Sequence, residues 1–217
     1  RFKQDTGIDV EVRYGGTAEL AATILEEGAN SPADVFFAQD AGSLGALAQA
    51  GRLTVLPDEV LNRVDARFRS PTGEWVGASG RARTLVYNTE RVQESDLPQS
   101  AFDLTGEQWN GLVGWAPTNA SFQSFVTAMR QLSGEDATRQ WLEAMLANGV
   151  QSFDNNAAIV EAVGRGEVLG GLVNHYYLFR FLEEQGEGFP ARNYFFPDGG
   201  ADALINIAGI GILDSSD

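Results

Sequence analysis

The chain contains no cysteine, a single histidine and few basic side chains. The absence of cysteine excludes disulfides, thiolate metal sites and cysteine nucleophiles. One histidine is a poor basis for the usual nucleophile–base networks, and the sequence has no P-loop, no H-E-x-x-H and no G-x-S-x-G motif. We therefore expect no enzyme, although 30 acidic residues leave a paired-carboxylate hydrolase open as a remote alternative.

Positive charge is scarce as well, since 15 Lys and Arg residues against 30 Asp and Glu residues give a formal net charge of −15. Nucleic acids and anionic membrane surfaces select clustered basic residues, so we expect neither as a partner. No apolar run reaches the ~18 residues needed to cross a bilayer, and no signal sequence is visible at Arg1.

Composition is otherwise that of a globular protein, because 43% of the 217 residues are hydrophobic. This length suits one large domain or two small ones. The first residues resemble the tail of a helix and the last residues follow an apolar strand, so we expect a longer parent protein, truncated here at both ends, whose targeting segment lies outside this chain.

Strand and helix patterns alternate along the sequence. Ile8, Val10 and Val12 keep the period of two of a strand, and Leu20 to Leu25 keep helical spacing. Further strands are predicted at 33–38, 75–79, 84–87, 112–116, 168–173, 193–196 and 204–213, and further helices at 44–50, after 57–58, and at 122–132, 137–147, 155–166 and 178–185. This alternation predicts an α/β fold of two lobes with a ligand crevice between them.

The segment Asn174-His175-Tyr176-Tyr177 follows the predicted strand 168–173, at the end that faces the ligand crevice in an open α/β sheet. A phenol has a pKa of ~10, so two adjacent phenolates at neutral pH need a strong positive charge, which a trivalent metal ion supplies. Phenolate oxygens are suitable ligands for hard ions such as Fe³⁺. The pair is also compatible with two tyrosines that simply cap the sheet and pack.

Three asparagines, Asn119, Asn156 and Asn174, stand at predicted strand-to-helix or loop-to-helix junctions. Helix N-termini offer unpaired N–H donors and a partial positive charge, so two or three that converge form an anion pocket. Each asparagine is equally consistent with an ordinary N-cap.

These features resemble the ferric-iron-binding proteins of bacterial ABC transporters, within the type 2 periplasmic binding proteins. The resemblance covers nearly the whole chain and rests on four motifs in order. The motifs are Ser31-Pro32-Ala33-Asp34-Val35-Phe36-Phe37, Ser79-Gly80-Arg81-Ala82-Arg83 with Val86-Tyr87-Asn88-Thr89, Pro117-Thr118-Asn119-Ala120-Ser121-Phe122, and Asn174-His175-Tyr176-Tyr177.

The resemblance implies a first lobe of residues 1–81 and 207–217 and a second lobe of residues 82–206. It implies Fe³⁺ ligation by Tyr176 and Tyr177, and a synergistic anion, carbonate or phosphate. The implied anion-binding residues are Asn119, Ala120, Ser121, Asn156, Asn174 and Arg81. It further implies a monomer in the periplasm, or a membrane-anchored lipoprotein, that delivers iron to an ABC transporter permease.

The sequence departs from the family pattern in the remaining metal ligands. A glutamate that ligates the metal in some members falls on Gln39, and a third tyrosine used by others falls near Phe122. Asp40 is either a ligand or a helix cap, and Tyr14 either reaches the crevice or packs. We expect His175 to lie beside the site rather than to ligate the metal. The nearest alternative function is a protein of the same fold that binds thiamine, a polyamine or an organic anion.

Overall fold

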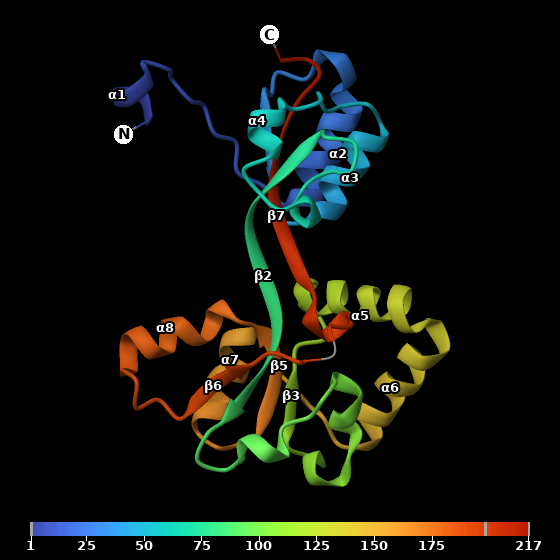
Figure 1. Cartoon of the computed structure of the whole chain (residues 1–217), viewed down its shortest axis with the longest axis vertical. Helices are drawn as coiled ribbons and strands as arrows, with labels where there is room; N and C mark the ends of the chain where they lie inside the picture. The colour runs from blue at the N-terminus through green and yellow to red at the C-terminus, as the bar shows by residue number, and fades with distance from the viewer. Residues whose placement is uncertain (1, 198, 217) are drawn as a thin grey trace. The chain divides into compact units, whose positions relative to one another are not determined.

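Two strands, β2 (Trp75–Asn88) and β7 (Ile205–Ile212), contribute residues to both of the units into which the chain divides (Figure 1). The computed structural model describes residues 2–197 and 199–216, apart from the side chain of Ala120. Unit 1 comprises Arg1–Gly80 and Ile207–Asp217, and unit 2 comprises Arg81–Asn206. Each unit combines helices with strands, so the predicted two-lobed α/β class is confirmed.

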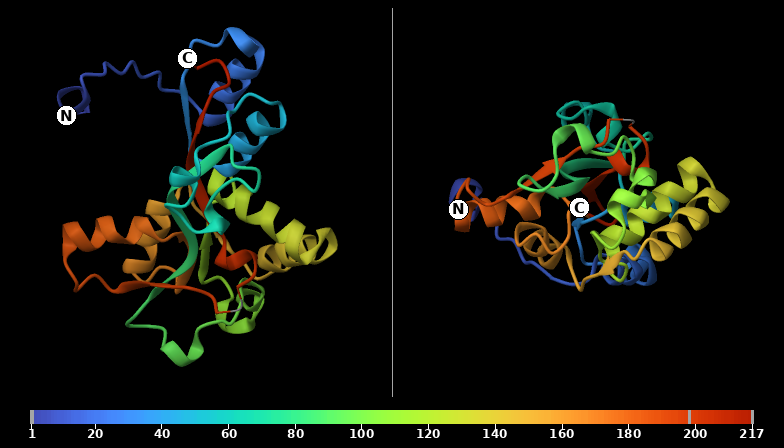
Figure 2. Two further views of the ribbon diagram at one scale, coloured as in Figure 1. Left: turned by 45° about the horizontal axis from the view of Figure 1, so that its top comes forward. Right: turned by 90° about the horizontal axis from the view of Figure 1, so that it is seen from below.

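Unit 1 contains α1 (Phe2–Thr6), α2 (Thr17–Glu27), β1 (Val35–Ala38), α3 (Ala41–Gln49) and α4 (Asp58–Leu61). Helices α2 and α3 pack side by side (Figures 1 and 2). Strand β1 runs antiparallel to β7, with Val35 opposite Ile212. The buried side chains of this core are Ala21, Ile24, Phe36, Ala38, Leu44, Leu47, Leu53 and Leu213.

The predicted strand at residues 8–12 is wrong. Ile8, Val10 and Val12 are 56%, 57% and 60% exposed, and the segment has no regular structure. A strand is stable only when another strand satisfies its backbone groups. Among the described residues, no strand pairs with this segment, and β1 pairs only with β7.

Unit 2 is built on a mixed sheet. Strand β2 runs antiparallel to both β5 (Gly170–Asn174) and β6 (Ala191–Tyr194). Strand β3 (Val113–Trp115) runs parallel to β5 and to β4 (Gln151–Ser152). The helices of this unit are α5 (Ala120–Ser133), α6 (Glu135–Ala147), α7 (Asn156–Gly164) and α8 (Tyr176–Gln185). Helices α5 and α6 follow each other in the chain and pack together (Figures 1 and 2).

Residues 75–88 form one strand rather than the two predicted on either side of Gly80-Arg81. Backbone hydrogen bonds to β2 continue directly after Gly80-Arg81. Ala82 O accepts one from His175 N at 3.0 Å, and Arg83 N donates one to Leu204 O at 2.9 Å. Glycine weakens a strand but does not end one whose hydrogen bonds persist.

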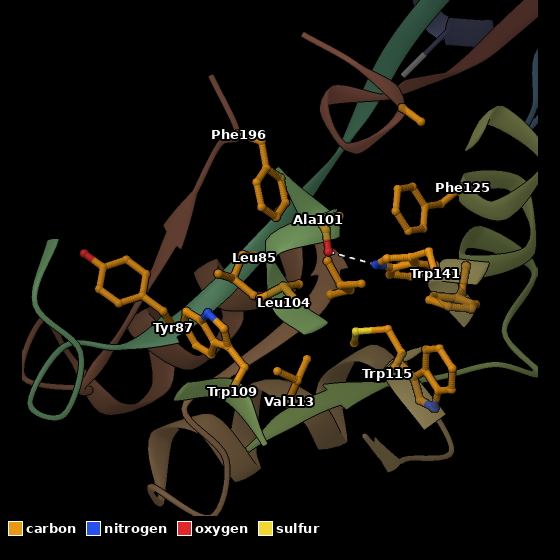
Figure 3. Close-up of a cluster of buried hydrophobic side chains, with 14 of the residues drawn as sticks. Leu85, Tyr87, Ala101, Leu104, Trp109, Val113, Trp115, Phe125, Trp141 and Phe196 are labelled. Atoms are coloured by element: carbon orange, nitrogen blue, oxygen red, sulfur yellow. Dashed lines mark hydrogen bonds between the residues drawn. The ribbon is translucent and has the colours of Figure 1, made fainter. Parts of the chain in front are cut away.

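The two faces of the unit 2 sheet cover separate cores. Leu85 and Tyr87 contribute to one core, whereas Val86 contributes to the other, as the alternation of a strand requires. In the first core, Trp141 Nε1 donates a hydrogen bond to Ala101 O at 2.8 Å (Figure 3). Trp109 lies in the same core, and its Nε1 has no partner in the described part of the chain.

The second core brings α7 close to β5. A Cβ built on Gly171 of β5 would lie 2.1 Å from Ile159 Cγ2 of α7, so only glycine permits this approach. The short distance between the two elements places the start of α7 beside the end of β5. Within the described residues, no helix is long and apolar enough to cross a membrane.

Candidate metal and anion site

Tyr176 and Tyr177 are the first two residues of α8, which begins two residues earlier than predicted. Both are half-buried, and their rings stack with centroids 4.4 Å apart and planes inclined by 27°. The two phenols therefore occupy one place in unit 2, directly after the last residue of β5 and His175.

Tyr177 is a phenol at neutral pH in the absence of metal. Burial, followed by the hydrogen bond with Tyr176 and the charge of Tyr176, raises the pKa of Tyr177 to about 12. The guanidinium groups of Arg180 and Arg81 act in the opposite direction but do not cancel this effect. A phenolate at this position consequently requires a bound cation.

The start of α5 is organised by a chain of three polar side chains. Asn119 is the N-cap, and its Oδ1 accepts hydrogen bonds from Ser121 N at 3.0 Å and Ser121 Oγ at 2.6 Å. Ser121 Oγ in turn accepts one from Arg83 Nη2 at 3.1 Å. Ala120 is the first residue of α5, but its side chain lies outside the described part. This 14-residue helix has the positive N-terminus that suits an anion.

Asn156 and Asn174 contact each other but neither is an N-cap. Asn156 Oδ1 accepts a hydrogen bond from Asn174 N at 3.1 Å, and both residues are buried. The cap of α7 is instead Asn155, whose Oδ1 accepts from Ala158 N at 3.0 Å. The N-cap position of α8 is His175, which makes no capping hydrogen bond through its side chain. Of the three predicted junction asparagines, only Asn119 caps a helix.

Arg81 and His175 border the tyrosines. Arg81 is half-buried, and its Nε is buried without a hydrogen-bond partner among the described residues. His175 Nδ1 accepts a hydrogen bond from Ala82 N at 3.1 Å, and His175 O accepts one from Asn193 Nδ2 at 2.8 Å. The Nδ1 atom of His175 is thus already used to hold the backbone of β2 at Ala82. The Nε–H of Arg81, in contrast, has no acceptor among the described residues.

The candidates in unit 1 have their own surroundings. Gln39 is exposed, and its backbone N donates to Thr17 Oγ1 at 3.4 Å. Asp40 is the N-cap of α3, with its Oδ1 accepting from Ser43 N at 2.9 Å. Tyr14 is 90% exposed and does not pack. In unit 2, Phe122 is a core residue that packs edge-on against Trp115.

Carboxylate clusters are absent from the described residues. No group of three His, Cys, Asp or Glu side chains could hold a metal ion there. Asp202 is the one buried acidic side chain in the same part of the chain, where it accepts a hydrogen bond from Ala101 N at 2.7 Å. A paired-carboxylate hydrolase would need two buried carboxyl groups in one crevice, so the structure offers no support for that alternative.

Sequence reasoning missed Arg83, which is buried in β2. The available signal was its position immediately before the apolar run 84–87, which places it inside the strand rather than at a flexible crossing.

Residues 30–201 match the model of a protein family described as bacterial extracellular solute-binding protein. The chain belongs to this family. This solute-binding protein is 35% identical over 216 residues to the Fe(3+)-binding periplasmic protein of Serratia marcescens, covering 99% of the chain and 64% of that relative. It is 34% identical over 218 residues to the major ferric iron-binding protein of Neisseria meningitidis, covering 99% of the chain and 66% of the relative. The chain therefore spans less than two-thirds of the length of these curated relatives.

Solved structures agree. Iron-bound HitA from Pseudomonas aeruginosa superposes with a TM-score of 0.85 at 38% identity, covering 100% of this chain and 70% of HitA. The Trichodesmium protein IdiA (FutA), solved with iron and citrate, gives a TM-score of 0.85 at 32% identity, covering 99% and 70% of the two chains. The resemblance predicted from the sequence motifs is confirmed.

Proposed function

We propose that this solute-binding protein captures ferric iron together with a synergistic anion, carbonate or phosphate, and delivers it to an ABC transporter permease. The single observation that carries the proposal is the stacked pair Tyr176 and Tyr177 at the start of α8. The names of the Serratia and Neisseria relatives and the iron-bound HitA structure support the same cargo.

In this proposal, the two phenols lose their protons and ligate Fe³⁺ as phenolates, which are hard oxygen donors. The anion binds near the start of α5, where Asn119 and Ser121 order the helix terminus. The free Nε donor of Arg81 contributes to the same anion, and Asn156 and Asn174 hold the end of β5 beside it.

In unit 1, Gln39 is the further metal ligand of this proposal, as its sequence position suggests. Closure of two lobes around hinge strands is a common way to remove a ligand from water. The lobes of this proposal are residues 1–81 with 207–217, and residues 82–206. The protein acts as a monomer in the periplasm or as a lipoprotein anchored outside the cytoplasm.

The deciding experiment is a titration of chelator-stripped, full-length protein with ferric iron in the presence of bicarbonate or phosphate. Phenolate ligation produces a visible tyrosinate-to-iron charge-transfer band. We expect the band in the wild type and its loss in Tyr176→Phe and Tyr177→Phe. The matched control is Tyr87→Phe, which alters a tyrosine in the core of the same unit and should leave the band unchanged.

A wild-type protein with no band in any of these anions would overturn ferric capture. In that case, a site for a small organic ligand becomes the better account. Stacking on an organic ligand does not need both hydroxyl groups, so Tyr177→Phe would then lose little affinity.

A further inference from the structure

Arg83 is a buried cation that forms no ion pair with any residue that the structure describes. Arg83 lies in β2, and only 2% of the residue is exposed to solvent. Nη1 donates a hydrogen bond to Leu172 O at 3.2 Å, and Nη2 donates to Ser121 Oγ at 3.1 Å. The guanidinium carbon also lies 5.6 Å from the ring centroid of Phe125. Among the described residues, no carboxylate lies within ion-pair distance of it.

Neutral acceptors and an aromatic ring compensate only part of the cost of removing a guanidinium from water. Burial accordingly lowers the pKa of Arg83 to about 10, an effect that Tyr176 and Tyr177 partly oppose. The group therefore remains charged at neutral pH, and no carboxylate in the described part of the chain compensates its positive charge.

The position of Arg83 links the separate parts of the candidate site. It lies opposite Asn174 in the pairing of β2 with β5. Its hydrogen bond to Ser121 reaches the start of α5, where Ser121 also contacts the N-cap Asn119. Tyr176 and Tyr177 are close enough to influence it electrostatically. One buried guanidinium thus contacts Ser121 at the start of α5, lies opposite Asn174 at the end of β5 and is affected by the charges of the two tyrosines.

Charge balance suggests what this cation is for. Two phenolates together with carbonate or hydrogenphosphate bring more negative charge than a ferric ion neutralises. A fixed positive charge behind the start of α5 offsets the excess, and it does so without occupying a coordination position on the metal.

We propose that Arg83 is a positioning residue for the synergistic anion, one that orders the start of α5 through Ser121 and supplies a fixed positive charge to the loaded site. This inference rests on the proposed function. It assigns a role to a residue that need not touch the iron.

The test measures how the apparent ferric affinity depends on the concentration of inorganic phosphate, at constant ionic strength, with the charge-transfer band as readout. We expect Arg83→Met to raise the phosphate concentration that gives the half-maximal effect by about tenfold or more, because a charged hydrogen-bond donor is lost. At saturating phosphate the band should return, since both tyrosines remain.

The matched control is Arg139→Met, which removes the same charge from an exposed position on α6 and should not shift the phosphate dependence. Arg83→Lys keeps the charge, but one ammonium does not reproduce the two guanidinium donors that bind Leu172 O and Ser121 Oγ. We expect it to shift the phosphate dependence in the same direction by a smaller factor.

A folded Arg83→Met protein with an unshifted phosphate dependence would show that Arg83 only stabilises the fold, and would overturn the inference while leaving ferric capture intact. If Arg83→Met does not fold, as circular dichroism would reveal, Arg83→Lys decides, and the absence of a shift in that variant overturns the inference. A wild-type protein without the band would overturn the inference and the proposed function together.

Discussion

The rings of Tyr176 and Tyr177 stack face to face, with centroids 4.4 Å apart, in the first turn of α8. Adjacent residues on a helix normally point in different directions, because they are separated by about 100° around its axis. At the helix start the two phenols instead lie together, and the hydrogen bond with Tyr176 and the charge of Tyr176 add to burial in raising the pKa of Tyr177. The pair therefore favours one shared cation over two independent anions.

The first prediction concerns pH. Because the pKa of Tyr177 is raised to about 12, iron must displace a proton from this phenol at neutral pH. Apparent ferric affinity should therefore rise as the pH rises, by roughly tenfold per pH unit for each proton released. Competition against a chelator of known protonation behaviour, at several pH values between about 6 and 8, measures this slope. A slope of zero would contradict metal ligation by a phenol that is protonated in the free protein.

The second prediction concerns Gln39. If this residue ligates the metal, Gln39→Glu should strengthen ferric binding, because a carboxylate is a better donor to a hard trivalent ion than a neutral amide. We expect an increase of about tenfold in apparent affinity. Gln49→Glu adds the same charge at an exposed position on α3 in the same unit, so it provides the control. Equal gains from both variants would indicate a general charge effect and would remove Gln39 from the ligand set.

The third prediction separates two neighbouring amides. Asn156→Ala removes the acceptor of the buried Asn174 N–H, whereas Asn155→Ala removes only the N-cap of α7. Loss of the cap should lower the free energy of unfolding by about 1 kcal/mol and leave anion dependence unchanged. Asn156→Ala should destabilise by about 1 to 3 kcal/mol and also weaken the response to phosphate. Chemical denaturation measures the loss of stability in each variant, and the phosphate titration measures the change in anion dependence. If the two variants behave identically, Asn156 is not part of the anion site.

The fourth prediction concerns the core of unit 2. Trp141 and Trp109 are equally buried. The indole of Trp141 donates a hydrogen bond to Ala101 O (Figure 3), whereas that of Trp109 has no acceptor among the residues that the structure describes. Trp141→Phe should therefore cost about 1 to 3 kcal/mol more unfolding free energy than Trp109→Phe. Denaturant unfolding monitored by circular dichroism measures both. Equal losses would mean that the hydrogen bond of Trp141 adds nothing to stability.

Local signals in the sequence predicted much of this arrangement. The side chains of Asp40 and Asn119 were expected at helix starts, and both cap their helices. The tyrosine pair was expected at the carboxyl end of a buried strand, and β5 ends at Asn174. Caps and strand ends depend on a few adjacent residues, so periodicity and residue type suffice to find them.

Other features depend on contacts between distant segments. Asn155 and Asn156 are chemically identical, and only the approach of α7 to β5 decides which one caps the helix and which one holds Asn174. Arg81 and Arg83 are chemically identical as well, yet Arg83 is buried and Arg81 is half-buried, and only the position of Arg83 next to the apolar run 84–87 hints at this difference. The period-two pattern at residues 8–12 was clear, but a pattern cannot supply the partner strand on which a strand depends.

One edge of β1, which has no partner strand among the residues described, affects how this chain should be handled in solution. In the described residues, one edge of this strand has no partner, and Val35 and Phe37 are 56% and 57% exposed. Such an edge invites pairing with the same edge of another molecule. The net charge of −15 keeps molecules apart, but salt screens that repulsion over about 10 Å at 0.1 M ionic strength. Aggregation should thus be slowest in dilute, low-salt buffer, and monodispersity needs to be verified by light scattering before any affinity is compared.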